Sequence, residues 1–301
     1  MNIKLIILLL IGIAAFTLYS CSTYRAINEN KSDNYYFNFY KTKVHYIPMG
    51  NWFELGNDIL ENVDVKTVQV LGENYIKDKS HVYYKATPIR NADVSSFKIL
   101  CSGFASYARD KNMVYYEGYS FQNMDIDSFC FAGDTCGSVL MDNHHVYSIY
   151  TLKKSINDNN GIIKPIAGVS PERYHQINNL YGKDDENVYC KGRAIDHANA
   201  RTFALISEYY ARDTSNIYYD GLKIEGLDAN TFMLIEGGSY SKDKNGVYYG
   251  LTAIDNDQGE PIRYTSKQVV GADPETFEMI MSDKVDYAKD KTKHYWGGVA
   301  E

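Results

Sequence analysis

The chain has 301 residues, a net charge of −7 and 45% hydrophobic residues, enough for one large globular domain or two smaller ones. The negative charge argues against a nucleic-acid partner, because such a partner needs a basic patch that replaces phosphate counterions. Tyrosine is the outlier, with 28 residues against only 6 prolines. Since aromatic side chains favour pleated, half-buried surfaces, this composition predicts strands.

The first segment is typical of a targeting signal. Lys4 precedes an apolar run over residues 5–18, which has secretory proportions and is short for a membrane span. The run leads into LYSC (residues 18–21), which resembles a bacterial lipobox, although Tyr19 replaces the usual small residue. The resemblance implies cleavage before Cys21 and lipidation of that residue. An uncleaved anchor and an ordinary signal peptide are the alternatives.

This signal sets the expected location of the protein. We expect a membrane-anchored lipoprotein of the bacterial cell envelope. In a diderm host the expected site is the outer membrane, because Ser22 after the Cys resembles an outer-membrane sorting signal. The membrane is then a partner through the lipid on Cys21.

A ten-residue motif recurs along the chain, as in YSKDKNGVYY (residues 240–249). Seven copies align on the Asp of "KD", and a Tyr follows five residues later in each copy. The aligned pairs are Asp78 and Tyr83, Asp110 and Tyr115, Asp142 and Tyr147, Asp184 and Tyr189, Asp213 and Tyr218, Asp243 and Tyr248, and Asp290 and Tyr295. A fixed period of about 30 residues is the signature of a stacked repeat architecture.

Turn chemistry explains the motif. The Asp can accept hydrogen bonds from backbone amides just ahead of it, which starts a tight turn between two strands. The third residue after the Asp is expected in a left-handed conformation, which suits Gly246 and is tolerated by Asn187, Asn216, His81 and His145. The alternative role of the repeated Asp, a carboxylate array, is less favoured than turn capping.

A second element accompanies each hairpin. Its copies are GADPETF (271–277), GLDANTF (226–232), NADVSSF (91–97), NMDIDSF (123–129), GVSPERY (168–174) and NVDVKTV (62–68). Asp273 and Pro274 are typical of a helix start, so we expect one helical turn and then a third strand. The last copy then stops half a unit short, and residues 34–72 form a degraded extra repeat.

These patterns predict an all-β array of about seven β-hairpin repeats with short helical turns. The array is expected to be an open solenoid or curved meander, and a β-propeller is the alternative. The expected division is a signal peptide (1–20), a lipidated Cys with a flexible tether (21–33), a divergent N-terminal repeat or cap (34–74), and the repeats (75–301).

The motif resembles that of the DKNYY family of bacterial repeat proteins over residues 75–301. This resemblance implies a protein of unknown function that is often exported or lipid-anchored. It implies no catalytic residues.

The mature chain would keep four cysteines, which lack the spacing of a zinc site. They are Cys101, Cys130, Cys136 and Cys190. Cys130 and Cys136 are close enough in sequence to bridge in an oxidising compartment. Their role as small buried hydrophobes is equally open.

Two insertions follow a "VYY"-type strand, NDNNG (157–161) and DNDQG (255–259). Asp255 and Asp257 alternate like the start of a calcium loop. The EF-hand pattern is not met, because Gly is the fifth residue rather than the sixth and Ser266 is at the twelfth position, where a Glu is required. We therefore favour a polar turn that ends an extended hairpin. His144 and His145 lie in a repeat turn, where a solvated role is simpler than metal ligation.

Familiar catalytic motifs are missing from the sequence. We therefore expect a protein without catalysis, cofactor or metal, with an interaction or envelope-structural role. The alternative is a glycan- or peptidoglycan-binding module, because tyrosines that face outward could stack on sugars. An envelope protein or a glycan is then the expected partner.

Overall fold

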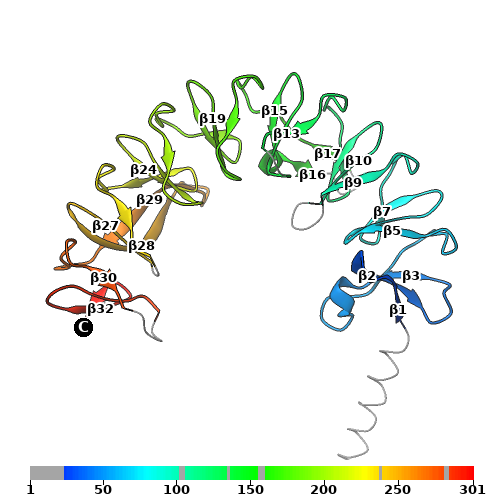
Figure 1. The fold of residues 1–301 in the computed structure, drawn as a ribbon, viewed down its shortest axis with the longest axis horizontal. Helices are drawn as coiled ribbons and strands as arrows, with labels where there is room; N and C mark the ends of the chain where they lie inside the picture. The colour runs from blue at the N-terminus through cyan, green and yellow to red at the C-terminus, as the bar shows by residue number, and fades with distance from the viewer. Residues whose placement is uncertain (1–23, 102–105, 134–135, 155–159, 237–238, 281–284) are drawn as a thin grey trace, which may run out of the picture. The chain divides into compact units, whose positions relative to one another are not determined.

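The computed structural model describes residues 24–101, 106–133, 136–154, 160–236, 239–280 and 285–301 (Figure 1). The signal peptide (1–20) and Cys21 lie outside the described residues. None of the helical segments in the described ranges has the length and apolar content to cross a bilayer. The described chain is nearly all β, in small sheets that follow one another along the sequence, which confirms the all-β repeat fold.

The chain divides into two compact units, as far as the structure describes their ranges. The first unit comprises Met1–Phe129, Asp134–Cys136 and Leu152–Lys164, and the second comprises Cys130–Gly133, Gly137–Thr151 and Pro165–Glu301.

The first unit contains fourteen strands and one 3-10 helix among its described residues. They are β1 (Tyr24–Asn28), β2 (Ser32–Asn38), β3 (Val44–Tyr46), η1 (Pro48–Gly50), β4 (Asp58–Ile59), β5 (Gln69–Gly72), β6 (Tyr75–Lys77), β7 (Val82–Tyr84), β8 (Thr87–Pro88), β9 (Lys98–Cys101), β10 (Tyr107–Arg109), β11 (Val114–Tyr116), β12 (Tyr119–Phe121), β16 (Lys153–Lys154) and β17 (Asn160–Ile162).

The second unit contains the remaining strands and a second 3-10 helix. They are β13 (Cys130–Phe131), β14 (Val139–Met141), β15 (Val146–Ser148), η2 (Ile149–Thr151), β18 (His175–Gln176), β19 (Tyr181–Lys183), β20 (Val188–Cys190), β21 (Arg193–Ala194), β22 (Ala204–Leu205), β23 (Tyr210–Arg212), β24 (Ile217–Tyr219), β25 (Leu222–Glu225), β26 (Met233–Leu234), β27 (Tyr240–Asp243), β28 (Gly246–Asp255), β29 (Pro261–Gln268), β30 (Glu278–Met279), β31 (Tyr287–Lys289), β32 (His294–Trp296) and β33 (Val299–Ala300).

A typical repeat is a four-stranded antiparallel meander, with one strand more than the sequence predicts. The sheets β5-β6-β7-β8, β18-β19-β20-β21 and β30-β31-β32-β33 have this form, and β13-β14-β15 has three strands among the described residues. The extra strand follows the "VYY" strand after a tight turn.

That tight turn is a two-residue hairpin loop with positive φ at both positions. The loops are Glu117-Gly118, Lys191-Gly192, Asp220-Gly221 and Gly297-Gly298. Such primed turns match the right-handed twist of the flanking strands, and they favour Gly at the second position. The residues three positions after the KD Asp, such as Gly246 and Asn187, do not have positive φ, so the prediction of a left-handed residue there is wrong.

The hydrophobic core is divided into clusters, each between two successive repeats. In one cluster Tyr75 and Val82 of one repeat pack with Phe97, Ala108 and Tyr115 of the next. Leu180, Tyr181 and Val188 pack in the same way with Phe203, Ala211 and Tyr218. Both faces of a repeat sheet are therefore buried, and each unit of sequence depends on its neighbours for stability.

A tyrosine hydroxyl joins each of several repeats to the following one. Tyr181 donates to the carbonyl of Tyr209 at 2.8 Å and accepts from the N–H of Gly221 at 2.9 Å. Tyr75 makes the same two bonds with Ser106 and Gly118. The buried hydroxyl thus satisfies backbone groups of the next turn that would otherwise be left without partners.

Long-range hydrogen bonds show where a repeat begins. The N–H of Asp93 donates to the carboxylate of Asp110 at 2.7 Å, so the "NAD" turn belongs to the hairpin that follows it. Asp273 donates to Asp290 in the same way. The last copy is therefore complete, because its turn precedes its sheet. The second element itself is one turn, in which the Asp228 carbonyl accepts from the N–H of Phe232 at 3.0 Å.

The N-terminal sheet β1-β2-β3-β4 follows the same plan with a longer turn. Asn38 stands where other copies have Asp, and its side-chain oxygen accepts from the N–H groups of Thr42 and Lys43. The hydroxyl of Tyr35 donates to the carbonyl of Lys85 in the next repeat. The segment expected as a flexible tether differs from expectation, since β1 and the start of β2 lie within it.

The two insertions are hairpins that add strands to a neighbouring repeat. Strand β29 pairs with β28 and also runs parallel to β25 of the preceding repeat, with Ile224 opposite Tyr264. Strand β17 runs parallel to β12 in the same manner. The DNDQG insertion is the predicted polar turn, where the Asn256 side chain accepts from the N–H groups of Gln258 and Glu260. Most of NDNNG lies outside the described residues.

Replacing Gly221 with Ala should lower stability for two reasons. The φ of Gly221 is +80°, and a Cβ there would lie 2.5 Å from the Cβ of Cys190 in the preceding repeat. We expect Gly221→Ala to cost about 1–3 kcal/mol more than Gly259→Ala, measured by urea denaturation. Gly259 is the matched control, because its φ is +77° and no atom lies within 4 Å of its added Cβ. Equal costs would contradict the close packing between repeats.

Candidate functional site

The repeated Asp is the centre of a hydrogen-bond set, which has four donors in the repeat of Asp110. One carboxylate oxygen of Asp110 accepts from the N–H groups of Asn112 and Met113. The other accepts from the N–H of Asp93 and from the hydroxyl of Tyr115, each at 2.7 Å. A carboxylate has about four acceptor positions, so this buried charge is fully engaged in holding the turn.

The structure places all seven repeated Asp–Tyr pairs in buried positions. Every one of these fourteen side chains is 7% exposed or less. The Tyr hydroxyl donates to its Asp at 2.7–3.1 Å in six copies, with Tyr115, Tyr147, Tyr189, Tyr218, Tyr248 and Tyr295. In the first full copy the hydroxyl of Tyr83 is buried without a hydrogen-bond partner in the described chain. These tyrosines are therefore not available for stacking on a ligand.

The electrostatics of the pair follow from burial and hydrogen bonding. Burial by itself raises the pKa of Asp213, but the N–H groups of Asn199 and Ser215 and the Tyr218 hydroxyl outweigh it and lower the pKa. Burial, with the nearby Asp184 carboxylate, raises the pKa of Tyr189 to about 12. Burial raises the pKa of its partner Asp184 too, but the N–H groups of Asn187 and Glu186 outweigh it and lower the pKa. At neutral pH the Asp184–Tyr189 pair is therefore a carboxylate that accepts and a protonated phenol that donates, rather than an acid–base couple.

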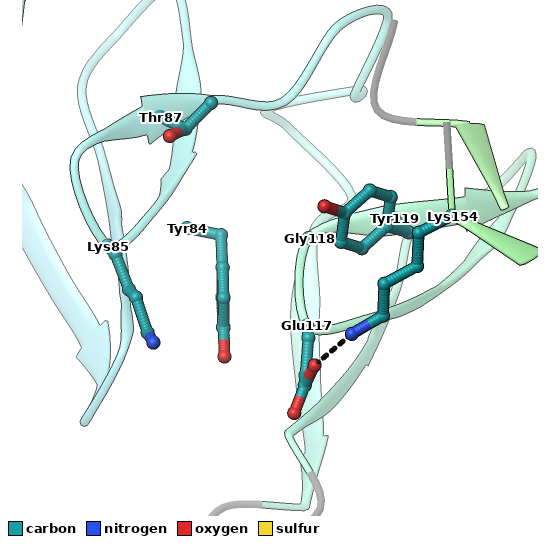
Figure 2. A pocket seen from close by; sticks show the side chains of 7 residues that line it. All are labelled: Tyr84, Lys85, Thr87, Glu117, Gly118, Tyr119 and Lys154. Carbon is teal, nitrogen blue, oxygen red and sulfur yellow. Dashed lines mark hydrogen bonds and ion pairs between the residues drawn. The ribbon is translucent and has the colours of Figure 1, made fainter. Parts of the chain in front are cut away.

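The surface between the first two full repeats forms a groove of about 370 Å³, which we call the first groove (Figure 2). Its lining residues are Tyr84, Lys85, Thr87, Glu117, Gly118, Tyr119 and Lys154. Lys154 comes from the insertion, reaches toward Glu117 and pairs with it at 2.6 Å (Figure 2). The Lys154 ammonium also lies 5.1 Å from the centre of the Tyr119 ring, within range of a cation–π contact.

An equivalent second groove of about 470 Å³ lies between two repeats of the second unit. Lys191 and Asp220 occupy the places of Lys85 and Glu117, seven residues after their KD Asp, and pair at 2.6 Å. Burial lowers the pKa of Lys191, but the bond to Asp220 outweighs it and the net pKa is raised. Burial and the Asp220 charge raise the pKa of Cys190 to about 12, so its thiol is protonated at neutral pH.

These grooves were not predicted from the sequence. A signal that could have indicated them is the x-Gly pair that begins two residues after the KD-motif Tyr in four of the seven copies, as in YEGY and YDGL. It fixes the turn, and the turn places the residue before Gly at the groove.

The comparison with known families agrees with this architecture. The DKNYY family model matches residues 6–119 and 107–252, which together cover most of the chain. The chain belongs to the DKNYY family. The match begins earlier and ends earlier than the span of 75–301 over which the motif is visible. Neither the curated proteins nor the solved structures contain a match to this DKNYY protein.

A third cavity of about 650 Å³, the tyrosine pocket, lies between the repeats of β24 and β27. Five tyrosines contribute to its lining, and they are Tyr209, Tyr210, Tyr219, Tyr240 and Tyr264. Tyr209 is 43% exposed, and its ring centre lies 6.1 Å from that of Tyr219. Tyr264 is supplied by the insertion strand β29 and meets Tyr219 edge to face. Tyr209 therefore presents accessible aromatic surface at this pocket, whereas Tyr240 is buried like the repeat tyrosines.

The cysteines pair differently from the candidate bridge in the sequence. A disulfide joins Cys101 to Cys136, while Cys130 is free and exposed and Cys190 is free and buried. The Cys130–Cys136 bridge is therefore not formed, and Cys190 has the role of a buried hydrophobe. Within the described ranges no group of three His, Cys, Asp or Glu side chains is placed to hold a metal ion.

A comparison of two Tyr→Phe substitutions tests the Asp–Tyr pair. Tyr218→Phe removes a hydrogen bond to a buried carboxylate and should cost about 1–3 kcal/mol of stability. Tyr83→Phe removes a hydroxyl that lies near the Asp78 carboxylate but makes no well-formed hydrogen bond in the described chain, so it should cost less than Tyr218→Phe. Denaturant unfolding of both variants measures the difference. If the two variants lose equal stability, the pair has no special energetic role.

Proposed function

We propose that this DKNYY protein is a non-catalytic binding scaffold that a lipid anchors to the bacterial cell envelope. The observation that carries the proposal is the recurrence of one surface groove at equivalent positions of two repeat pairs. In each groove a Lys and an acid, each seven residues after its KD Asp, line the same surface. Repetition of a surface along an array suits a partner that is itself extended, such as a polymer or a protein.

The state of the side chains supports binding rather than catalysis. The repeated carboxylates already hold turns together, as the four donors to Asp110 illustrate. The groove residue Lys191 keeps its proton and its ion pair, and the thiol of Cys190 is protonated. A nucleophile or general base needs a pKa near the working pH, and these two groups lie well above it. The net charge of −7 also disfavours a nucleic-acid partner.

The location in the envelope rests on the sequence. The apolar run over residues 5–18 ends at a lipobox-like LYSC, which supports lipidation of Cys21. Ser22 supports sorting to the outer membrane in a diderm host. A lipid anchor would hold the array at a membrane surface, where envelope proteins and glycans are the available partners.

Crosslinking in intact cells tests the anchored scaffold. A photo-crosslinking residue in place of Thr87, at the first groove, should capture an envelope component. The additional substitution Cys21→Ala should abolish lipidation and leave the apolar run over residues 5–18 uncleaved, which the larger mass of the protein reports. Mass spectrometry of the N-terminal peptide measures the lipid directly.

The matched control is Cys130→Ala, which removes an exposed free thiol and should leave both lipidation and crosslink unchanged. An unmodified Cys21 in the mature wild-type protein would refute the anchor. A lipidated protein that gives no crosslink at the groove would refute the scaffold.

Glycan binding is the second candidate function, and the tyrosine pocket favours it. Aromatic rings that line a cavity of about 650 Å³ offer apolar faces to the C–H groups of a sugar ring. Ser207, Ser239 and Glu236 also line the pocket, and they supply polar groups suited to sugar hydroxyls.

Retention on purified peptidoglycan tests this candidate. Tyr209→Ser removes the most exposed ring and should abolish retention, whereas Tyr209→Trp keeps an aromatic face and should preserve it. Sedimentation with insoluble peptidoglycan measures both. Wild-type protein that stays in the supernatant, or a Ser variant that binds like wild type, would rule the candidate out.

A further inference from the structure

The β2–β3 turn carries exposed aromatic and basic side chains together. Phe39 is 53% exposed and Tyr40 is 80% exposed, and their rings meet edge to face at 5.2 Å. Lys41 and Lys43 follow in the same turn, and the Arg25 guanidinium lies 6.0 Å from the centre of the Phe39 ring. We call these five residues the anchor-proximal tip.

The tip is held in a defined conformation. The side chain of Asn38 accepts hydrogen bonds from the N–H groups of Thr42 and Lys43 at 2.7 and 3.1 Å, and donates to the Thr42 hydroxyl at 2.9 Å. The Lys41 N–H closes the turn onto the Asn38 carbonyl. A hydrogen-bonded turn therefore exposes two large aromatic side chains to solvent. Polar side chains are the usual choice at such exposed positions of a protein surface.

The tip lies at the end of the sheet where the chain arrives from Cys21. Tyr24 pairs with Asn38 in the antiparallel β1–β2 register, next to Phe39. Cys21 is three residues before Tyr24, so a fully extended chain separates them by about 11 Å at most. This limit holds for any conformation of the intervening residues. A lipid on Cys21 would keep this end of the sheet close to the headgroup layer.

The charge of the tip matches an anionic surface although the whole chain is acidic. Arg25, Lys41 and Lys43 carry positive charge, and Glu61, which follows β4 at this end of the sheet, is the neighbouring acid. Aromatic side chains concentrate at the membrane–water interface, and each Lys or Arg near an anionic leaflet strengthens binding roughly fivefold.

We infer that the anchor-proximal tip docks into the headgroup layer of an anionic lipid bilayer. Phe39 and Tyr40 enter the interface while the basic side chains contact lipid phosphates. The docking fixes the orientation of the first repeat, because the tip is rigidly joined to β2 and β3. This inference rests on the proposed lipid anchor at Cys21.

Fluorescence of the lipidated protein in vesicles tests the inference. The protein is purified from membranes and reconstituted into vesicles of phosphatidylethanolamine and phosphatidylglycerol that contain brominated lipids. Tyr40→Trp should report quenching by bromine several-fold above Phe53→Trp, after subtraction of the signal of Trp52 and Trp296 in the parent. Phe53 is a matched control because it is 81% exposed and lies in the loop beyond the opposite end of β3.

A charge reversal provides a second readout. Lys41→Glu with Lys43→Glu should reduce quenching of Tyr40→Trp in anionic vesicles and leave flotation with the vesicles unchanged, since the lipid provides flotation. Equal quenching at positions 40 and 53, or none at position 40 in a lipidated protein that floats, would overturn the docking. A protein without lipid on Cys21 would instead refute the proposed anchor, and with it the distance limit used here.

Discussion

The buried carboxylate of the KD Asp is the interaction on which the other features of a repeat depend. In Asp213 it joins the N–H groups of its own turn, the N–H of Asn199 fourteen residues earlier, and the hydroxyl of Tyr218 in the next strand. An Asn side chain offers only one acceptor oxygen, so it cannot accept all four donors. A buried charge is costly unless it is satisfied. Each of the seven carboxylates accepts at least three hydrogen bonds, which explains how they remain buried.

The same carboxylate explains why the repeats stack. It fixes the preceding turn against the hairpin, and that turn delivers a Phe such as Phe203 to the cluster shared with the previous repeat. The hydrogen bond from the N–H of Gly221 to the Tyr181 hydroxyl then joins the earlier repeat to the later one. Each repeat is therefore stabilised by its neighbours. A three-residue strand such as Val188–Cys190 is stable in the array although it would not be stable alone.

Local patterns in the sequence were sufficient for the repeat, the Asp-capped turn and the all-β class. The residue at which a repeat begins could not be predicted from the sequence, because it depends on the hydrogen bond from the N–H of Asp93 to the Asp110 carboxylate across a loop and a strand. The fourth strands, such as Thr87–Pro88, are too short to show alternation. The disulfide of Cys101 with Cys136 and the tyrosine pocket depend on packing between distant segments. The Asp220-Gly221 turn could have been predicted from the sequence, because an Asp-Gly pair directly after a strand is the usual hairpin signal.

The division between buried and exposed positions indicates where function can vary in such a chain. The KD Asp and the Tyr five residues later are tied to packing, so a change at either alters the fold before it alters a surface. The positions six, seven and nine residues after the Asp face the grooves, and there the two grooves differ, with Thr87 in one and Arg193 in the other. The insertions add Lys154 to the lining of the first groove and Tyr264 to that of the tyrosine pocket. Specificity is therefore expected in the residues that the repeats do not share, because the shared residues are already committed to holding the array together.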